Sequence, residues 1–220
     1  MTPEVPPPHP LARVLENAAL GRFPDADGAV EVLPPDADGT LAVVSLTGHA
    51  YVLGEVDPEE VAVRAPEGGY GSSLAPEFLL WLAGEGAEID SIDLLLVWGG
   101  EANRAARLAA TAEYDDHPRV RRAHEHRRDV SVHASRDGLV LLGAGLAGRR
   151  EIAVELFDPA TAPRGAGRRL VAAGLAALAP DEHVWAQVAP GNARSLRAFL
   201  AAGFLPVGSE VLITPRRDER

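Results

Sequence analysis

The C-terminal half of this chain of 220 residues alternates strand-like and helix-like segments, and that order limits the folds open to it. The segments "VSVHAS" (130–135) and "LVLLGAGLA" (139–147) flank "RDG", a strong turn signal that predicts a β-hairpin. A third strand pattern, "EIAVELF" (151–157), follows the hairpin. Helix, strand, helix and strand patterns then run to residue 214. We therefore expect an α/β protein of the α+β type, a mixed sheet with helices on its faces.

The other elements follow from apolar periodicity and from turn residues. The later ones are a helix through "LVAAGLAALA", the strand "VWAQVA", a helix "NARSLRAFLAAGF" and the strand "SEVLIT". The earlier ones are a helix from Pro10, short strands within 28–33, 40–46 and 50–56, a helix in 75–86, a strand in 91–100 and a charged helix in 117–129. The edge beside "SEVLIT" needs a partner, either the N-terminal half or a second copy of the chain in a homodimer.

Composition divides the chain. We expect a flexible Pro-rich tail at 1–9, an N-terminal α/β region of unclear function at 10–110, and a region carrying the glycine motifs at 111–220. Residues 1–116 hold 5 arginines and 21 carboxylate side chains, whereas residues 117–220 hold 16 arginines and 11 carboxylates. A basic half can hold a polyanion and an acidic half can attract a cation; the alternative is solvated surface without a ligand.

Several function classes are excluded or disfavoured. Without cysteine there is no disulfide, thiolate nucleophile or Cys-ligated zinc, and without lysine there is no Schiff base or Walker A lysine. The seven histidines form no metal-binding pattern, and no basic, aromatic-rich module suggests nucleic acid. No apolar run reaches the roughly 18–20 residues of a membrane span, and the start lacks the features of a signal peptide, so a cytoplasmic protein is expected.

Two glycine-rich segments compete as ligand sites. "GAGLAG" (143–148) satisfies the dinucleotide pattern G-x-G-x-x-G, but a strand pattern follows where that site needs a helix. Glycines relieving crowding in a twisted hairpin strand explain it better. "RGAG" (164–167) lies between a strand and a helix, so amides of the first helical turn, the helix dipole and three nearby arginines favour a phosphate. A helix start without a ligand is the alternative.

A second motif lies 25 residues downstream of that loop. "GNARSLRAFLAAGF" opens a helix at an Asn, places Ser195 three residues later and closes on Gly-Phe. The two motifs together resemble the GNAT superfamily of N-acetyltransferases. Their acetyl-CoA loop follows Arg/Gln-x-x-Gly-x-Gly/Ala, matched here by Arg164 and Gly167. Their next helix follows Asn-x-x-Ala/Ser…Tyr…Gly-Phe, matched by Asn192, Ser195 and the Gly-Phe at 203–204. The resemblance covers about residues 117–213.

This resemblance implies a GNAT-like acyl-CoA-binding fold with acetyl-CoA as the acyl-donor cosubstrate. The pantetheine arm would run like an added strand between "EIAVELF" and "VWAQVA", and the pyrophosphate would rest on amides of 165–169. The residues implied in cofactor binding are Leu156, Phe157, Arg164, Gly165, Ala166, Gly167, Arg168, Arg169, Asn192 and Ser195. The function expected is N-acetyl transfer to a small-molecule or peptide amine, with neither nucleic acid nor membrane as partner.

Direct transfer to an amine needs a base. Glu151 and Glu155 lie four apart on one face of the strand 151–157. Glu151 lies at the offset from Arg164 at which histone-type members of the superfamily carry their base, and Glu155 is the second candidate. Either would have its pKa raised by partial burial. The alternative is that both are strand carboxylates paired with Arg149, Arg150 or other arginines.

Two positions depart from the family pattern. Arg169 stands where the loop ends in Gly or Ala, so the backbone approach is tighter there or the side chain points to solvent. Phe199 stands where the family often carries a tyrosine general acid, which leaves Tyr114, a water or another group to protonate the thiolate. These departures keep open a non-catalytic acyl-CoA sensor and an interaction module. His133 and His183 are spare acid–base candidates that we expect to be structural.

Overall fold

The computed structural model describes residues 7–100, 107–179 and 181–214, and the chain forms two compact units. Unit 1 comprises residues 1–93 and 207–220, and unit 2 comprises residues 94–206. The division therefore does not follow the expected boundary near residue 110. The strand in 91–100 contributes mainly to unit 2, whereas the last strand contributes to unit 1 from Val207 onward.

Unit 1 contains a mixed sheet in which strands far apart in sequence pair. Its elements are α1 (Pro10–Ala19), β1 (Val30–Leu33), β2 (Leu41–Leu46), β3 (His49–Leu53), α2 (Pro58–Arg64), η1 (Ser72–Leu74), α3 (Pro76–Ala83), β4 (Glu88–Ile89) and most of β10 (Leu205–Thr214). β1 is parallel to β3, β3 is antiparallel to β2, and β10 is antiparallel to both β2 and β4. The N-terminal region thus completes the edge left by the last strand. Helix α2 was not predicted.

The N-terminal tail is anchored where it meets α1. The side chain of His9 caps that helix by accepting a hydrogen bond from the Leu11 amide, and its Nε2 lies 2.9 Å from the Pro34 carbonyl oxygen. Since Nδ1 is the acceptor, Nε2 carries the proton and donates. His9, the last residue of the predicted flexible tail, is thus held against the start of α1 and Pro34, while residues 1–6 of that prediction lie outside the described residues.

Unit 2 carries the predicted hairpin and both motifs. Its elements are β5 (Asp93–Trp98), α4 (Pro118–His126), β6 (Arg128–Ser135), β7 (Gly138–Ala144), η2 (Leu146–Gly148), β8 (Arg150–Leu156), α5 (Ala166–Leu175), β9 (Val184–Val188) and α6 (Ala193–Ala201). The sheet order is β5-β9-β8-β7-β6, in which only the β8–β9 pair is parallel. The expected mixed sheet is confirmed.

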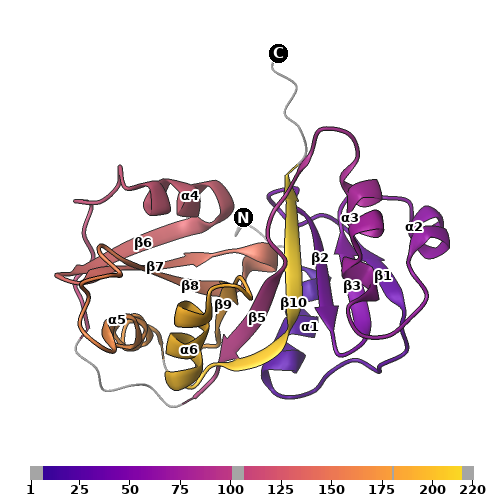
Figure 1. The fold of residues 1–220 in the computed structure, drawn as a ribbon. Helices are drawn as coiled ribbons and strands as arrows, with labels where there is room; N and C mark the ends of the chain where they lie inside the picture. Colours follow the sequence, from indigo (N-terminus) through magenta and orange to yellow (C-terminus); the bar gives the residue numbers. More distant parts are fainter. Residues whose placement is uncertain (1–6, 101–106, 180, 215–220) are drawn as a thin grey trace, which may run out of the picture. The chain divides into compact units, whose positions relative to one another are not determined.

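Helices cover both faces of the unit 2 sheet (Figure 1). On one face, α5 and α6 bury a core with the alternate strand residues Val140, Ile152 and Ala186. On the other face, α4 packs on Leu141 and Ala153. Because strand side chains alternate between the two faces, a single strand such as 151–156 contributes side chains to both cores. No helix in the described parts of the chain is long and apolar enough to cross a bilayer.

Candidate functional site

The loop "RGAG" ends in an open helix N-terminus. Gly165 has φ +77°, a left-handed conformation that favours glycine, and α5 begins at Ala166. The Ala166 amide donates to the Pro163 carbonyl, and the Arg169 amide donates to Gly165. Between them, the amides of Gly167 and Arg168 have no hydrogen-bond partner among the described residues. These two N–H groups and the helix dipole favour an anion at this point.

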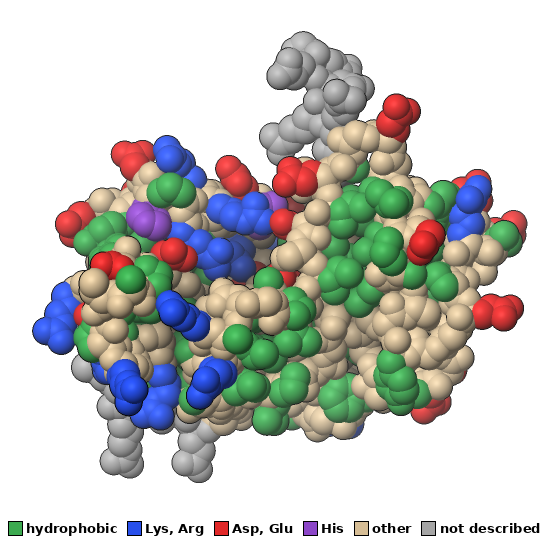
Figure 2. Space-filling view, in the orientation of Figure 1, with side chains coloured by type: hydrophobic (Ala, Val, Ile, Leu, Met, Phe, Trp, Pro, Cys, Tyr) green, Lys and Arg blue, Asp and Glu red, His purple; other side chains and the backbone are tan. Residues whose placement is uncertain are grey.

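Arginines surround this helix start. Arg164 and Arg168 are exposed, and neither has a carboxylate within 4.0 Å in the described part of the chain. Figure 2 shows Arg side chains, in blue, gathered over the part of unit 2 that holds α5 and α6. An anion bound to the amides would therefore meet guanidinium groups that no carboxylate neutralises.

Arg169, the unexplained residue of the loop, is folded back. Its Nη1 donates to the Arg164 carbonyl oxygen at 3.0 Å, and its Nη2 lies 3.4 Å from Oδ2 of Asp137, which belongs to the β6–β7 turn. The side chain thus ties the loop to that turn instead of pointing freely into solvent. A glycine or alanine here would lack both contacts.

Gly167 is a glycine that packing does not require. A Cβ added there would meet only Ala198 of α6, at an ordinary 3.6 Å. Gly174, two turns later, differs: its Cβ would lie 2.6 Å from Ile152 and 2.7 Å from Val140, so helix–sheet packing demands it. Neither contacts within the described residues nor a positive φ require glycine at this position, so the backbone of Gly167 is open to close approach.

Strands β8 and β9 are splayed. They run parallel, but the register pairs them only at Glu151 and Trp185. β8 is fully paired with β7 on its other side, from Arg150 to Leu156. Beyond Glu151, one edge of β8 is consequently open as the strand runs toward the loop and α5.

The backbone directions along β8 can be assigned. The Phe157 amide donates to the Asp137 carbonyl at 3.1 Å, so Phe157 faces the β7 side. In an antiparallel ladder, successive residues alternate between facing the partner and facing away. The N–H and C=O groups of Leu156 and Val154 therefore face the open edge. The sequence analysis named Leu156 and Phe157 for this edge and missed Val154. The Phe157 amide already donates to the Asp137 carbonyl.

Asn192 and Ser195 form a helix cap. The Asn192 Oδ1 accepts a hydrogen bond from the Ser195 amide at 3.1 Å at the start of α6. Next to them, Nη1 of Arg194 lies 3.5 Å from the Pro159 carbonyl of the β8–α5 loop. The motif thus has a local structural role, which fixes the start of α6 beside the loop.

Glu151 lies in a buried ion cluster. Its side chain is 5% exposed; Oε2 accepts from Nε of Arg127 at 2.6 Å and Oε1 from Nε of Arg149 at 2.8 Å. Burial by itself raises the pKa of Glu151, but Arg149 and Arg127 outweigh it, so the pKa lies below its ordinary value. The expected upward shift is wrong for Glu151, because two guanidiniums hold the carboxylate charged. Arg127 also contacts Gln187 of β9 at 3.2 Å.

The segment "GAGLAG" is built around this cluster. A Cβ on Gly145 would lie 2.2 Å from the carboxyl group of Glu151, and one on Gly143 would lie 3.1 Å from the Arg127 side chain. Strand β8 follows the segment, with no helix for a pyrophosphate. The expectation that these glycines relieve crowding is confirmed for Gly143 and Gly145, whereas Gly148 has open space around it and a φ of +79°.

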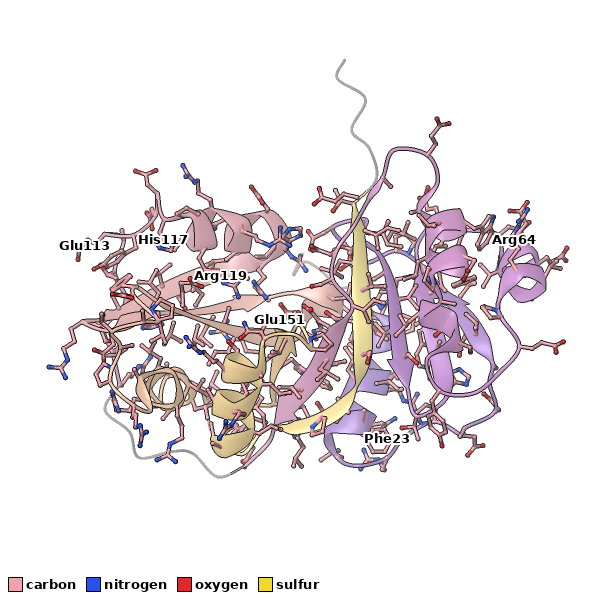
Figure 3. The ribbon with its side chains drawn as sticks, in the orientation of Figure 1. Phe23, Arg64, Glu113, His117, Arg119 and Glu151 are labelled. Atoms are coloured by element: carbon pink, nitrogen blue, oxygen red, sulfur yellow. The ribbon has the colours of Figure 1, made fainter. Side chains whose placement is uncertain are left out.

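Glu155 differs from Glu151 in being half-exposed, on the face that α4 covers. At the end of the same strand, Phe157 stacks on Tyr114 with ring centroids 5.2 Å apart and meets the edge of His117 at 6.4 Å. His117 caps α4 through Nδ1, so its Nε2 carries the proton. In Figure 3, Glu113 and His117 lie at the far end of the strand layer from Glu151. Nothing in the spacing of Tyr114 and His117 predicts this grouping.

Two further candidates, Phe199 and His133, are buried. Phe199 is buried in the core, where it packs edge-on against Phe204 at 4.9 Å. His133 is buried, with Nδ1 3.1 Å from the Leu108 carbonyl and Nε2 3.3 Å from the Ser131 hydroxyl. Phe199 has no hydroxyl group, so it cannot replace the tyrosine as the general acid.

Known proteins offer similarity in structure only. No protein-family profile and no curated protein matches the chain. An acetyltransferase assigned to the GNAT family from Novosphingobium aromaticivorans has TM-score 0.43 and 15% identity, covering 61% of this chain and 69% of its own. A GCN5-related N-acetyltransferase from Kribbella flavida has TM-score 0.43 and 14% identity, covering 94% and 95%. A conserved protein of unknown function from Staphylococcus epidermidis has TM-score 0.41 and 13% identity, covering 65% and 68%.

Proposed function

We propose that this protein is an acyl-CoA-dependent N-acyltransferase, with acetyl-CoA as its donor. The observation that carries the proposal is the open edge of β8, which leads from the single β8–β9 pair at Glu151 to the uncapped helix start at Gly167. An open strand edge can bond the amides of an extended arm, and a helix start at its end can bind a diphosphate. The two features in line therefore suit a ligand that carries both groups.

The donor would lie along this line. Its two amides would bond the outward-facing groups of Val154 and Leu156, as an added strand does. Its pyrophosphate would meet the Gly167 and Arg168 amides and the guanidiniums of Arg164 and Arg168. Asn192 would contact the arm, and Ser195 supports that position through the cap.

In the reaction, the amine nitrogen attacks the thioester carbonyl carbon, the C–S bond breaks and the thiolate leaves. The amine loses a proton and the thiolate gains one, so amide and free thiol result. Glu155 is the better acceptor of the amine proton, directly or through a water, because Glu151 is already bonded to two arginines. Tyr114 stacks on Phe157, at the diphosphate end of the arm, so a water is our candidate donor to the thiolate.

The acceptor would be a small-molecule or peptide amine. Residues 1–93 and 207–220, which form unit 1, hold 6 arginines against 20 carboxylate side chains. Such a balance attracts cations, and an alkylamine is protonated at neutral pH. It therefore favours a cationic amine over an anionic acceptor.

A second candidate is a non-catalytic acyl-CoA sensor. It is favoured by Phe199, which has no hydroxyl where the family often carries a tyrosine, and by the ion pairs that engage Glu151, the first candidate base. Binding alone does not separate the two candidates, but turnover does.

The test has two parts. Calorimetry with acetyl-CoA is expected to show saturable binding; its absence would overturn both candidates. A thiol-release assay over a library of amines is then expected to show turnover that Glu155→Gln lowers about 100-fold, with acetyl-CoA affinity unchanged. The exposed Glu113→Gln is the matched control, expected to leave both unchanged. Binding without thiol release from any amine would favour the sensor.

A further inference from the structure

Gln187 on β9 is the one glutamine of the chain, and its side chain is linked to β8 through an arginine. Its Oε1 accepts a hydrogen bond from Nη2 of Arg127 at 3.2 Å. Arg127 also donates through Nε to Oε2 of Glu151 at 2.6 Å. Since Glu151 lies on β8, at the single pair between β8 and β9, Arg127 joins the two strands where they begin to diverge. The Gln187 amide therefore lies beside the gap between them.

The orientation of this amide is fixed by its partner. A guanidinium group only donates, so the Gln187 atom that meets Arg127 is the carbonyl oxygen, and Nε2 is the other end of the amide. Nε2 is buried and has no hydrogen-bond partner within the described ranges of the chain. A buried amide nitrogen without a partner is costly, and most such groups in folded proteins have one. Gln187 thus has N–H groups to donate to an outside acceptor.

Gln187 shares a face of the sheet with the candidate base. It lies two residues after Trp185, which the register pairs with Glu151. Because Arg127 contacts both Gln187 and Glu151, these two side chains are on the same face. Glu155 is four residues after Glu151 on β8, so it is also on that face. The Gln187 amide and the Glu155 carboxylate therefore flank the gap from opposite strands.

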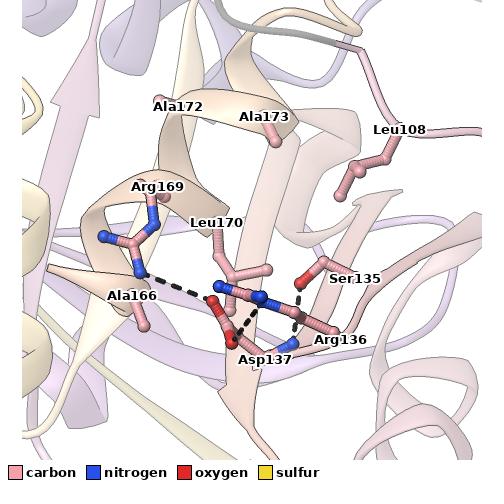
Figure 4. A pocket seen from close by; sticks show the side chains of 9 residues that line it. All are labelled: Leu108, Ser135, Arg136, Asp137, Ala166, Arg169, Leu170, Ala172 and Ala173. Carbon is pink, nitrogen blue, oxygen red and sulfur yellow. Dashed lines mark hydrogen bonds and ion pairs between the residues drawn. The ribbon is translucent and has the colours of Figure 1, made fainter. Parts of the chain in front are cut away.

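This place differs from the cavity of unit 2, which lies between α5 and the β6–β7 turn (Figure 4). None of the described residues that line the cavity belongs to β8 or β9. An occupant of the cavity would therefore leave Nε2 of Gln187 without a partner. A ligand that lies in the gap between β8 and β9 is the nearer source of an acceptor.

We propose that Nε2 of Gln187 donates a hydrogen bond to the carbonyl oxygen of the acyl donor's thioester, and that Arg127 holds the amide in place. The inference rests on the proposed function, since it takes the donor's arm to lie along the open edge of β8. With the diphosphate at α5, the arm runs toward the closed end of the gap, and its thioester comes to the part that Gln187 flanks. Gln187 is then a catalytic residue, and Arg127 is a positioning residue.

Such a donor acts where charge develops in the reaction. As the amine nitrogen bonds to the thioester carbon, the carbonyl oxygen becomes an oxyanion, and a fixed N–H group stabilises it without giving up its proton. The oxyanion then collapses, the C–S bond breaks, and the thiolate leaves and takes a proton from water. A carboxamide is not a base, so the amine proton goes to Glu155 across the gap.

NMR on the wild-type protein tests the contact directly. Because the chain has a single glutamine, ¹⁵N labelling of the glutamine side chain gives one pair of Nε2 proton resonances. Two unreactive donors serve as probes: the ketone in which a methylene replaces the sulfur of acetyl-CoA, and S-ethyl-CoA, in which a methylene replaces the carbonyl. The ketone is expected to move one of the two resonances downfield, because that proton becomes hydrogen-bonded, whereas S-ethyl-CoA should not.

Calorimetry with the same two probes separates this inference from the proposed function. If both probes bind and the Gln187 resonances respond to them alike, the inference fails and the proposed function stands. If neither probe binds, the acyl-donor site itself is refuted, and both fail.

Two variants test the role of Gln187 in turnover. Gln187→Met keeps a side chain of similar size without its N–H groups, and it is expected to lower kcat about 100-fold with acetyl-CoA affinity unchanged. Gln187→Glu can still accept from Arg127 but has no N–H group to donate, so a similar loss is expected. A Gln187→Glu variant as active as wild type would overturn the inference, because the position would then need no donor.

Asn17→Leu is the matched control. Asn17 is a half-buried amide on α1 whose Oδ1 accepts from Nη2 of Arg22 at 2.8 Å, so this variant loses the same kind of amide–arginine contact in unit 1. It is expected to leave kcat and acetyl-CoA affinity unchanged. A loss of kcat in Asn17→Leu equal to that in Gln187→Met would show that breaking any such contact suffices, and the role of Gln187 would be overturned.

Discussion

The two glycine-rich segments of unit 2 look alike in sequence but differ in what requires their glycines. In "GAGLAG", Gly145 gives room to the carboxyl group of Glu151, so a contact within the protein explains it. In "RGAG", the φ of Gly165 explains one glycine, but Gly167 has only Ala198 near its would-be Cβ, at 3.6 Å. The first segment serves an internal ion cluster, and the second leaves backbone open to an outside partner.

This difference shows why a motif match alone misleads. "GAGLAG" fits a nucleotide-binding pattern in full, yet a strand and a buried carboxylate occupy the space that a phosphate would need. "RGAG" fits a shorter pattern but has open amides at Gly167 and Arg168. The two segments differ in whether other protein atoms occupy the space where a Cβ on the glycine would lie.

The largest expected effect comes from removing the charge that "GAGLAG" surrounds. Glu151→Gln is expected to lower the free energy of unfolding by about 3 kcal/mol at pH 7, because both arginines lose the carboxylate they share. Arg149 and Arg127 outweigh the effect of burial and hold the folded pKa below the ordinary value of 4.5. The stabilisation is therefore present above pH 4.5 and lost as the pH falls through the folded pKa. Urea unfolding at several pH values measures it.

The matched control is Glu155→Gln on the same strand, which is half-exposed and is expected to change stability by less than about 0.5 kcal/mol. If Glu151→Gln were as stable as wild type at pH 7, or if the difference grew toward pH 3, the cluster would not act as described. Loss of turnover without loss of stability would instead return Glu151 to the role of base.

The next effect tests the glycine itself. Gly145→Ala is expected to destabilise the protein by about 2–3 kcal/mol, since the new Cβ would lie 2.2 Å from the Glu151 carboxyl group and the cluster must shift. Gly191→Ala is the control, because a Cβ there meets nothing within 4 Å and its φ is not positive. Thermal and urea unfolding measure both. Equal stability of the two variants would mean that Gly145 is not needed for packing.

The sequence predicts unit 2 well because its signals are local. The "RDG" hairpin, the strand 151–157 and the helix after "RGAG" follow from periodicity and turn residues, and all are present. The mixed sheet also follows from the alternation of strand and helix patterns, but its strand order was not predicted. Helix α2 was missed because its seven residues carry only one buried side chain, Val61, too little for a periodic signal.

The parts that were not predicted depend on contacts distant in sequence. Arg127 meets Glu151 across 24 residues and Gln187 across 60, so no spacing rule anticipates the cluster or the lowered pKa. Asp137 meets Arg169 across 32 residues, which is why the side chain at the end of the loop was unexplained. Local patterns give elements and loops, whereas charge partners require the fold.

The last prediction concerns the open glycine of "RGAG". Gly167→Asp is expected to weaken acetyl-CoA binding about 30-fold, because a carboxylate beside the open amides repels the diphosphate. Stability should not fall, since the site has room and an acidic side chain in the first helical turn favours the helix dipole. Calorimetry and urea unfolding measure the two effects on one variant.

Gly167→Ala separates charge from bulk. It is expected to raise the free energy of unfolding by about 0.5 kcal/mol, as alanine favours a helix over glycine, while binding weakens less than with Asp. Gly145→Ala and Gly167→Ala, the same change in the two segments, should thus have opposite effects on stability. A Gly167→Ala variant that is destabilised like Gly145→Ala would show that protein contacts, and not a ligand, require the glycine, and the contrast between the segments would be lost.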